Sequence, residues 1–146
     1  MSKEKKLNNE NSASNKLRLG LPKGSLQEAT IRMMKRAGWS VNVSERSYFP
    51  SVDDDELEIV LLRAQEIPRY VHDGVLDCGI TGYDWACEYE EDLHDLVELP
   101  YSRATARPTR WVPVVPEDLP TQQPVDLPGK PIATDGVVIT DGYPTL

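Results

Sequence analysis

The stretch LRLGLPKGSLQEATIRMMKRAG, residues 17–38, decides the fold class of this chain. Its first five residues alternate in character and then meet Pro22, a pattern typical of a short strand that ends in a loop. Apolar side chains then recur at helical spacing, and Gly38 stands where such a helix would end. Ser25 and Glu28 have the spacing of a capping box. We therefore predict a strand, a tight loop and a helix in succession.

The alternation of strands and helices continues to about residue 100. Further strands are predicted at residues 39–43, 57–62, 75–80 and 96–99, and further helices at residues 64–73 and 83–91. The strand at 57–62 is mostly apolar, as is typical of a strand covered on both faces. Strands that alternate with helices in this way indicate an α/β fold with parallel strand pairs. We expect residues 16–100 to form the first α/β lobe.

Both ends of the chain differ from this pattern. Residues 1–15 are polar, lack a hydrophobic period and are predicted to form a disordered tail. Most of the twelve prolines lie in the last third of the chain, and Pro113 makes the apolar run at 111–115 an edge or irregular strand. Residues 136–144 show no helical pattern. We predict that residues 101–146 begin a second lobe that is incomplete.

The composition argues against several classes of protein. The 146 residues carry a net charge of −8 and a pI near 4.7, so a basic nucleic-acid-binding surface is not expected. No apolar run approaches the roughly 18 residues of a membrane span, and no hydrophobic stretch follows the N-terminal lysines as in a secretory signal. Cys78 and Cys87 lack the spacing of a metal or redox motif. We expect a cytoplasmic protein that binds neither nucleic acid nor membrane.

The loop after the first predicted strand has the features of an anion-binding site. Lys23, Gly24 and Ser25 precede a predicted helix, whose free amides and dipole attract anions. Arg63 follows the strand at 57–62, where a guanidinium can bind phosphate or carboxylate through two hydrogen bonds. Two alternatives stay open: an ordinary turn with a surface lysine, and an ion pair between Arg63 and one of the many acidic side chains.

A second glycine-containing loop follows the strand predicted at 75–80. Gly79 and Gly82 either let the backbone approach a ligand or simply make the turn. Asp84 lies near a helix start, which stabilises a carboxylate without any function. Open α/β sheets bind ligands at the carboxyl ends of their parallel strands, where both loops are expected. The acidic runs at 53–56 and 88–95 lack metal-ligand spacing and are interpreted as solvated surfaces.

Five motifs, taken together and in order, resemble the ATP phosphoribosyltransferase family over about residues 17–135. They are LRLGLPKGSL (17–26), Arg46 before Phe49-Pro50, LRAQEIP (62–68), DCGITGYD (77–84) and LPGKPIAT (127–134). This family catalyses the first step of histidine biosynthesis: it joins N1 of ATP to C1 of 5-phosphoribosyl 1-diphosphate and releases diphosphate, with Mg²⁺ on the phosphates. The resemblance implies a two-lobed fold similar to periplasmic binding proteins of type II, with the substrates in the cleft.

The resemblance also implies roles for single residues. Lys23 and Gly24 would line the phosphate side of the cleft, Arg46 and Arg63 would contact the anion and the nucleotide, and residues 79–84 would form a second wall. Arg110 lies where the family often has a basic residue entering the second lobe. Such a transfer needs cations and amides that neutralise and orient phosphates, so we assign no catalytic nucleophile and no metal-ligating residue.

The chain departs from the family pattern at three places. Ser25 replaces a basic residue of many members, Pro113 stands in an apolar strand, and the loop that would bind the phosphoribosyl diphosphate is expected downstream of Leu146. We therefore expect a truncated enzyme that is inactive alone. The alternatives are a nucleotide-binding or regulatory module that retains the cleft loops, and an α/β protein of unrelated role. In the intact enzyme we expect a homo-oligomer or a regulatory subunit.

Overall fold

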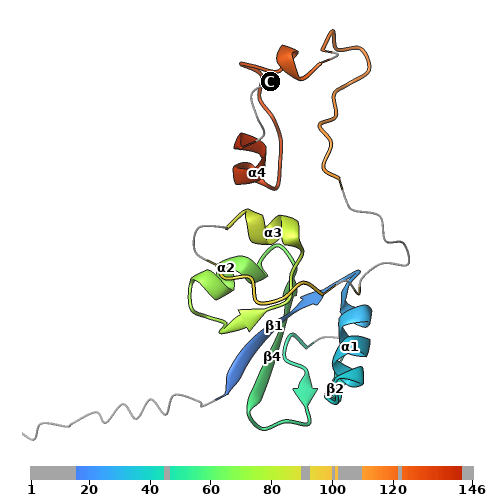
Figure 1. The fold of residues 1–146 in the computed structure, drawn as a ribbon. Coiled ribbons are helices and arrows are strands. Elements are labelled where there is room, and N and C mark those ends of the chain that lie inside the picture. The colour runs from blue at the N-terminus through green and yellow to red at the C-terminus, as the bar shows by residue number, and fades with distance from the viewer. Residues whose placement is uncertain are drawn as a thin grey trace, which may run out of the picture.

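The centre of the molecule is a small parallel sheet (Figure 1). The computed structural model describes residues 16–44, 47–89, 93–99, 101, 110–121 and 123–142. β1 (Leu17–Lys23) lies in the middle of the sheet, between β4 (Leu57–Arg63) and β5 (Cys78–Gly79). β1 pairs with both neighbours in parallel. The α/β fold with parallel strand pairs is thereby confirmed.

The main core lies between this sheet and α1 (Gln27–Arg36). Leu21 of β1 packs with Met34 of α1 and with Ile59 and Leu61 of β4, and all four side chains are buried. Complete burial of a side chain of this size contributes about 1.5–3 kcal/mol to stability. The alternation predicted for the first strand therefore points Leu19 and Leu21 into the core that α1 covers.

On the opposite face of β1, side chains from other parts of the chain pack against Gly20, which has no side chain of its own. A Cβ at Gly20 would lie 2.6 Å from Cδ1 of Leu76, and both Leu76 and Ile67 are almost completely buried. α2 (Ile67–His72) covers this face, while α1 covers the other (Figure 1). Because successive residues of a strand point to opposite faces, one glycine permits the close approach on a single face.

Both of these helices end as the sequence predicts. Gly38, just beyond α1, has a φ of +106°, and Gly74, just beyond α2, has a φ of +70°, the left-handed conformation that favours glycine. Pro68 lies in the first turn of α2, where its missing N–H costs nothing. α2 is shorter than the predicted 64–73, because the three residues before Ile67 form a turn.

The predicted capping box is wrong. Leu26 is the N-cap of α1, and no side chain makes a capping hydrogen bond there. Because the helix begins after Leu26, Ser25 lies one position too early to reach the free amides of the first turn. The Glu28 carboxylate instead accepts a hydrogen bond from Arg32, one turn further along the helix.

The remaining elements before residue 100 differ in extent from the prediction. β5 covers two residues of the predicted 75–80, and α3 (Tyr83–Cys87) covers the first part of the predicted 83–91. β2 (Val41–Asn42) lies within the predicted strand at 39–43 and pairs in antiparallel fashion with β3 (Ser51–Val52), which was not predicted. The strand predicted at 96–99 is wrong: these residues are irregular, because no strand of the described chain pairs with them.

The last part of the described chain forms a helix that the sequence does not predict. α4 (Val137–Asp141) lies within residues 136–144, which were expected to have no helical pattern, so that expectation is wrong. The amides of Val138 and Ile139 donate hydrogen bonds to the two carboxylate oxygens of Glu88 at 2.8 and 3.1 Å. So short a helix is unstable in water by itself. A carboxylate from about 50 residues earlier supplies partners for its free amides.

Outside α4, the C-terminal part is mostly irregular. Residues 111–115 form no strand, whereas an edge or irregular strand was predicted there. A 3-10 helix, η2, covers Pro124–Asp126. The tail predicted at residues 1–15 lies outside the described residues, and the lobe boundary near residue 100 stays a prediction. No helix in the described ranges is long and apolar enough to cross a lipid bilayer.

Asp77 joins the start of β1 to the segment before β5, and its effect on stability is expected to depend on pH. Its carboxylate accepts hydrogen bonds from the Arg18 backbone N–H at 2.7 Å and from the Arg18 guanidinium at 2.8 and 3.1 Å. These hydrogen bonds lower the pKa of Asp77 from 3.8 to about 2. The folded state therefore binds this proton more weakly than the unfolded state does. The stabilisation is complete above pH 3.8 and is lost as the pH falls through about 2.

The variant Asp77→Asn keeps an acceptor for the backbone N–H but has no charge. We expect it to be less stable than the parent near neutral pH, and we expect the difference to shrink steadily from about pH 4 to about pH 2. Urea unfolding of both proteins across this range measures the difference. A difference that stays constant with pH would show that the charge of Asp77 contributes nothing.

Candidate functional site

The carboxyl ends of the parallel strands bring the predicted site loops to one edge of the sheet. Lys23 and Arg63 are register partners at the ends of β1 and β4. Beyond β5, the Thr81 hydroxyl donates a hydrogen bond to the Ala64 carbonyl at 2.6 Å, which ties the loop after β5 to the turn after β4. Two cationic side chains therefore lie at the edge where open α/β sheets bind ligands.

The Lys23 side chain lies against an aromatic ring that the sequence analysis did not single out. Its Nζ is 4.0 Å from the centroid of the Tyr48 ring, within the range of a cation–π interaction. The Tyr48 backbone carbonyl accepts a hydrogen bond from the Leu61 N–H at 2.7 Å, which holds the residue beside β4. No local pattern identifies Tyr48, because its position depends on a contact with a strand that follows it in the chain.

Arg63 forms the ion pair that the sequence left open as an alternative. Its guanidinium donates to Glu66 at 2.7 Å. This hydrogen bond raises the pKa of Arg63 above its ordinary value and lowers the pKa of Glu66. The Arg63 side chain is 69% exposed, and an ion pair at such a site contributes little to stability because solvent screens it. A phosphate can therefore compete with Glu66 for the guanidinium.

The loop between β1 and α1 is open to solvent at its glycine. Gly24 has a φ of +90°, and no heavy atom lies within 4 Å of the position that a Cβ would take. The Gly24 carbonyl accepts a hydrogen bond from Gln27 N–H at 3.1 Å, which closes the turn before the helix. Ser25 is exposed in this turn. The backbone at Gly24 and Ser25 is therefore accessible to an anion.

Gly79 has a packing role that the sequence does not reveal. A Cβ at this position would lie 2.3 Å from Cγ2 of Ile67, which is nearer than any real Cβ contact. Gly79 is also the register partner of Gly20 across the β1–β5 pair. The absence of a side chain at both positions lets Ile67 of α2 press against the sheet. Close packing alone therefore accounts for a glycine here.

Gly82 and Asp84 lie at the start of α3, and Asp84 contacts the C-terminal part of the chain. Gly82 is the N-cap of α3, with an extended backbone. One oxygen of the Asp84 carboxylate accepts from the Trp85 N–H at 3.0 Å, and the other accepts from the indole N–H of Trp111 at 3.3 Å. The rings of Trp85 and Trp111 meet edge to face at 5.8 Å. The Asp84 carboxylate is thereby occupied by contacts within the protein.

Two of the predicted site residues remain, Arg110 and Arg46. Arg110 is exposed and directly precedes Trp111, the residue that contacts α3. Arg46 lies outside the described residues, between Ser44 and Ser47. Their roles in binding stay predictions.

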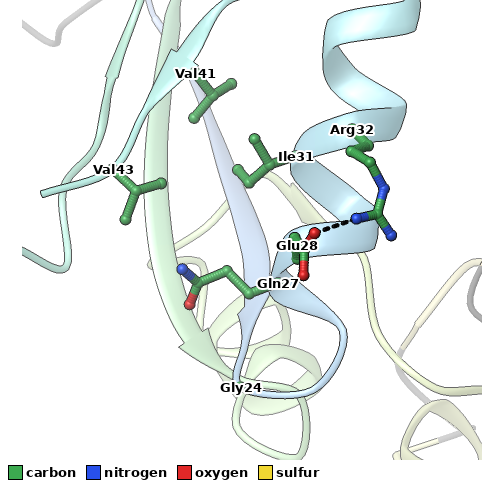
Figure 2. Close-up of a pocket in the computed structure, with 7 residues that line it drawn as sticks. All are labelled: Gly24, Gln27, Glu28, Ile31, Arg32, Val41 and Val43. Carbon is green, nitrogen blue, oxygen red and sulfur yellow. Dashed lines mark hydrogen bonds and ion pairs between the residues drawn. The ribbon is translucent and has the colours of Figure 1, made fainter. Parts of the chain in front are cut away.

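A hollow of about 420 Å³ lies next to this edge, between α1 and β2 (Figure 2). Ile31, Val41 and Val43 form its apolar side, and the paired Glu28 and Arg32 lie on the helix. Its lining includes Gly24 but neither Lys23 nor Arg63. The charges of Glu28 and Arg32 in the hollow cancel. The edge where β1 and β4 end, here called the strand-end edge, has two cations, Lys23 and Arg63, and one carboxylate, Glu66. A phosphate therefore fits the strand-end edge better.

Metal binding by the protein's own side chains has no candidate among the described residues. Within these ranges, no group of three or more His, Cys, Asp or Glu side chains is arranged to hold a metal ion. In the acidic run at 53–56, Asp54 accepts a hydrogen bond from the indole N–H of Trp39 at 3.0 Å, and Asp53 accepts from the Ser40 N–H at 2.7 Å. This run therefore also holds the segment before β2 in place, beyond the purely solvated role that was predicted.

Comparison with known proteins gives one consistent family. The family model described as "HisG: ATP phosphoribosyltransferase" matches residues 63–145 of this chain. The ATP phosphoribosyltransferase of Thermodesulfovibrio yellowstonii is 53% identical over 127 residues, which are 87% of this chain and 44% of that protein. The ATP phosphoribosyltransferase of Pelotomaculum thermopropionicum is 55% identical over 128 residues, which are 88% of this chain and 44% of that protein.

One solved structure similar to this chain is the "ATP phosphoribosyl transferase (HisG:HisZ) complex from Thermotoga maritima". It matches with a TM-score of 0.48 and 28% sequence identity, over 57% of this chain and 40% of that chain. The chain spans less than half the length of the curated relatives it matches.

Proposed function

Because the chain belongs to the ATP phosphoribosyltransferase family, we propose that it supplies the nucleotide-phosphate side of that enzyme's cleft. In the proposed reaction the N1 lone pair of ATP forms a bond to C1 of 5-phosphoribosyl 1-diphosphate. The bond between C1 and the diphosphate oxygen breaks, and diphosphate leaves with the electron pair. The observation that carries the proposal is the pairing of Lys23 with Arg63 at the ends of two parallel strands.

The residues at this edge suit a reaction in which phosphates must be held and neutralised. Lys23 provides a compact charge, and Arg63 provides a planar group that binds two phosphate oxygens at once. The accessible backbone at Gly24 leaves room for the anion to approach. Fixed cations stabilise the charge that develops on phosphate oxygens as the leaving group departs. Mg²⁺ belongs to this proposal as part of the MgATP substrate.

The phosphoribosyl-diphosphate site is proposed to lie in the part of the relatives that this chain does not match. The relatives are more than twice as long as the matched segment. We therefore propose that the chain alone binds MgATP without turnover. For the intact enzyme we also propose a second subunit, either another copy of the chain or a regulatory protein. Its proposed location is the cytoplasm.

Calorimetric titration and a chimeric enzyme test this function separately. We expect the chain to bind MgATP saturably, with a dissociation constant of roughly 1 mM or below. A chimera in which this chain replaces the matched part of the Thermodesulfovibrio yellowstonii protein is expected to form phosphoribosyl-ATP, detected by mass spectrometry. Absence of saturable MgATP binding would overturn the proposed site. Binding without turnover in the chimera would overturn the proposed activity and leave a nucleotide-binding module.

A further inference from the structure

Tyr48 contacts one of the two cations that the proposed function assigns to phosphate binding. Tyr48 is 54% exposed, and the Lys23 ammonium lies over its ring at 4.0 Å from the centroid. We propose that Tyr48 is a positioning residue, whose ring holds the Lys23 ammonium at the strand-end edge so that Lys23 and Arg63 together receive the phosphates. This inference rests on the proposed function for the identity of its ligand.

The backbone around Tyr48 is fixed by two independent sets of hydrogen bonds. The Tyr48 carbonyl accepts from Leu61 N–H at 2.7 Å, which joins the residue to the interior of β4. On either side, the Ser47 hydroxyl accepts from the Phe49 N–H at 3.0 Å and donates to the Phe49 carbonyl at 2.9 Å. The ring therefore projects from a held turn, and a side chain on a held turn can orient another group.

Lysine benefits from such a partner more than arginine does. Its ammonium ends a flexible chain of four methylene groups, and ordering that chain on binding costs free energy. Lys23 is already ordered over the Tyr48 ring before any ligand arrives. Arg63, its register partner, is ordered by Glu66 in the same way. Each cation at the edge thus has its own partner within the protein.

An aromatic partner differs from a carboxylate in its effect on the charge of Lys23. An aromatic ring holds an ammonium over its face without neutralising it, whereas a carboxylate at the same place would cancel the charge. Tyr48 therefore orients Lys23 and leaves its full charge available to a phosphate.

The test combines nuclear magnetic resonance of the free chain with MgATP titration. In the parent, the ring current of Tyr48 is expected to shift the Hε resonances of Lys23 upfield. We expect Tyr48→Leu to abolish this shift and to weaken MgATP binding about two- to fivefold, the range of an exposed cation–π contact. Tyr48→Phe keeps the ring and is expected to retain both the shift and the affinity.

Two further variants show whether the effect passes through Lys23. In a Lys23→Gln background, Tyr48→Leu is expected to have no additional effect on MgATP affinity, because the group that it orients is gone. Phe49→Leu, which changes a more exposed aromatic side chain in the same turn, is expected to bind like the parent. Urea unfolding confirms that each variant folds.

Each contrary result has a distinct meaning. Unchanged Lys23 resonances in Tyr48→Leu, or an equal loss of affinity in Tyr48→Phe, would overturn the positioning role while MgATP binding by the parent still supported the proposed function. Failure of the parent to bind MgATP, with the ring-current shift present, would overturn the proposed function and with it the assigned ligand.

Discussion

Gly79→Ala is expected to lower the free energy of unfolding by about 1–3 kcal/mol, the usual cost of overpacking a filled core. The new Cβ would lie 2.3 Å from Cγ2 of Ile67, whose side chain is almost completely buried. Neither group can move freely, because Ile67 begins α2 and Gly79 pairs with β1. At an unstrained, open position the same change would stabilise a protein by roughly 0.4–1 kcal/mol. Urea unfolding measures the difference.

A second substitution shows whether Ile67 causes this loss. Ile67→Leu keeps the side-chain volume but removes the Cγ2 methyl, and such a change usually costs less than about 1.5 kcal/mol by itself. The double variant Gly79→Ala with Ile67→Leu is expected to lose at least about 0.5 kcal/mol less than the two single losses added together. If the two single losses in free energy of unfolding simply add, contact with the Ile67 methyl is not the reason why position 79 is a glycine.

Arg63→Ala is expected to weaken MgATP binding about ten- to a hundredfold, since the variant loses charge-assisted hydrogen bonds to the phosphates. The guanidinium lies at the end of β4 beside Lys23 and forms an exposed ion pair with Glu66. Arg63→Lys keeps the charge but loses the two-pronged geometry, so its affinity is expected to be intermediate. Calorimetric titration compares the three proteins.

Two control variants separate the local effect of Arg63 from net charge. Arg69 of α2 forms an ion pair with Asp73, just beyond the helix, so Arg69→Ala removes one positive charge elsewhere in the same part of the chain. We expect Arg69→Ala to bind MgATP like the parent. Glu66→Gln releases Arg63 from its partner and is expected to bind as tightly as the parent or slightly more tightly. An equal loss in Arg69→Ala and Arg63→Ala would mean that net charge alone governs binding.

The cationic pair of the candidate site could be predicted because it depends on short-range patterns. Lys23 and Arg63 each follow a stretch whose pattern predicts a strand. The ends of neighbouring parallel strands meet at one edge of the sheet. Tyr48 could not be predicted in the same way. Its place over Lys23 depends on a hydrogen bond to Leu61 in β4, and no spacing within its own loop encodes that contact.

The roles of residues in the loop after β5 could not be predicted from local sequence either. The sequence identifies Gly79, Gly82 and Asp84 as a group but leaves their roles open between ligand approach and turn formation. The structure assigns Gly79 a close contact with α2, and Asp84 a hydrogen bond to Trp111. Both partners are distant in sequence, so the roles follow from how the chain packs. Substrate contacts at these residues stay predictions.

The sequence by itself determined the central unit of this protein: the strand Leu17–Lys23, the helix Gln27–Arg36, and the parallel partner Leu57–Arg63. Alternation, helical periodicity and a terminal glycine are properties of neighbouring residues, and burial of the resulting apolar faces requires little further information. Only the tertiary structure decided the helix Val137–Asp141 and the position of Tyr48. The helix depends on Glu88, whose carboxylate accepts from its amides, and Tyr48 depends on Leu61, whose N–H donates to its carbonyl. The sequence near each element does not specify these partners. Backbone groups need hydrogen-bond partners, and the fold provides them from other parts of the chain.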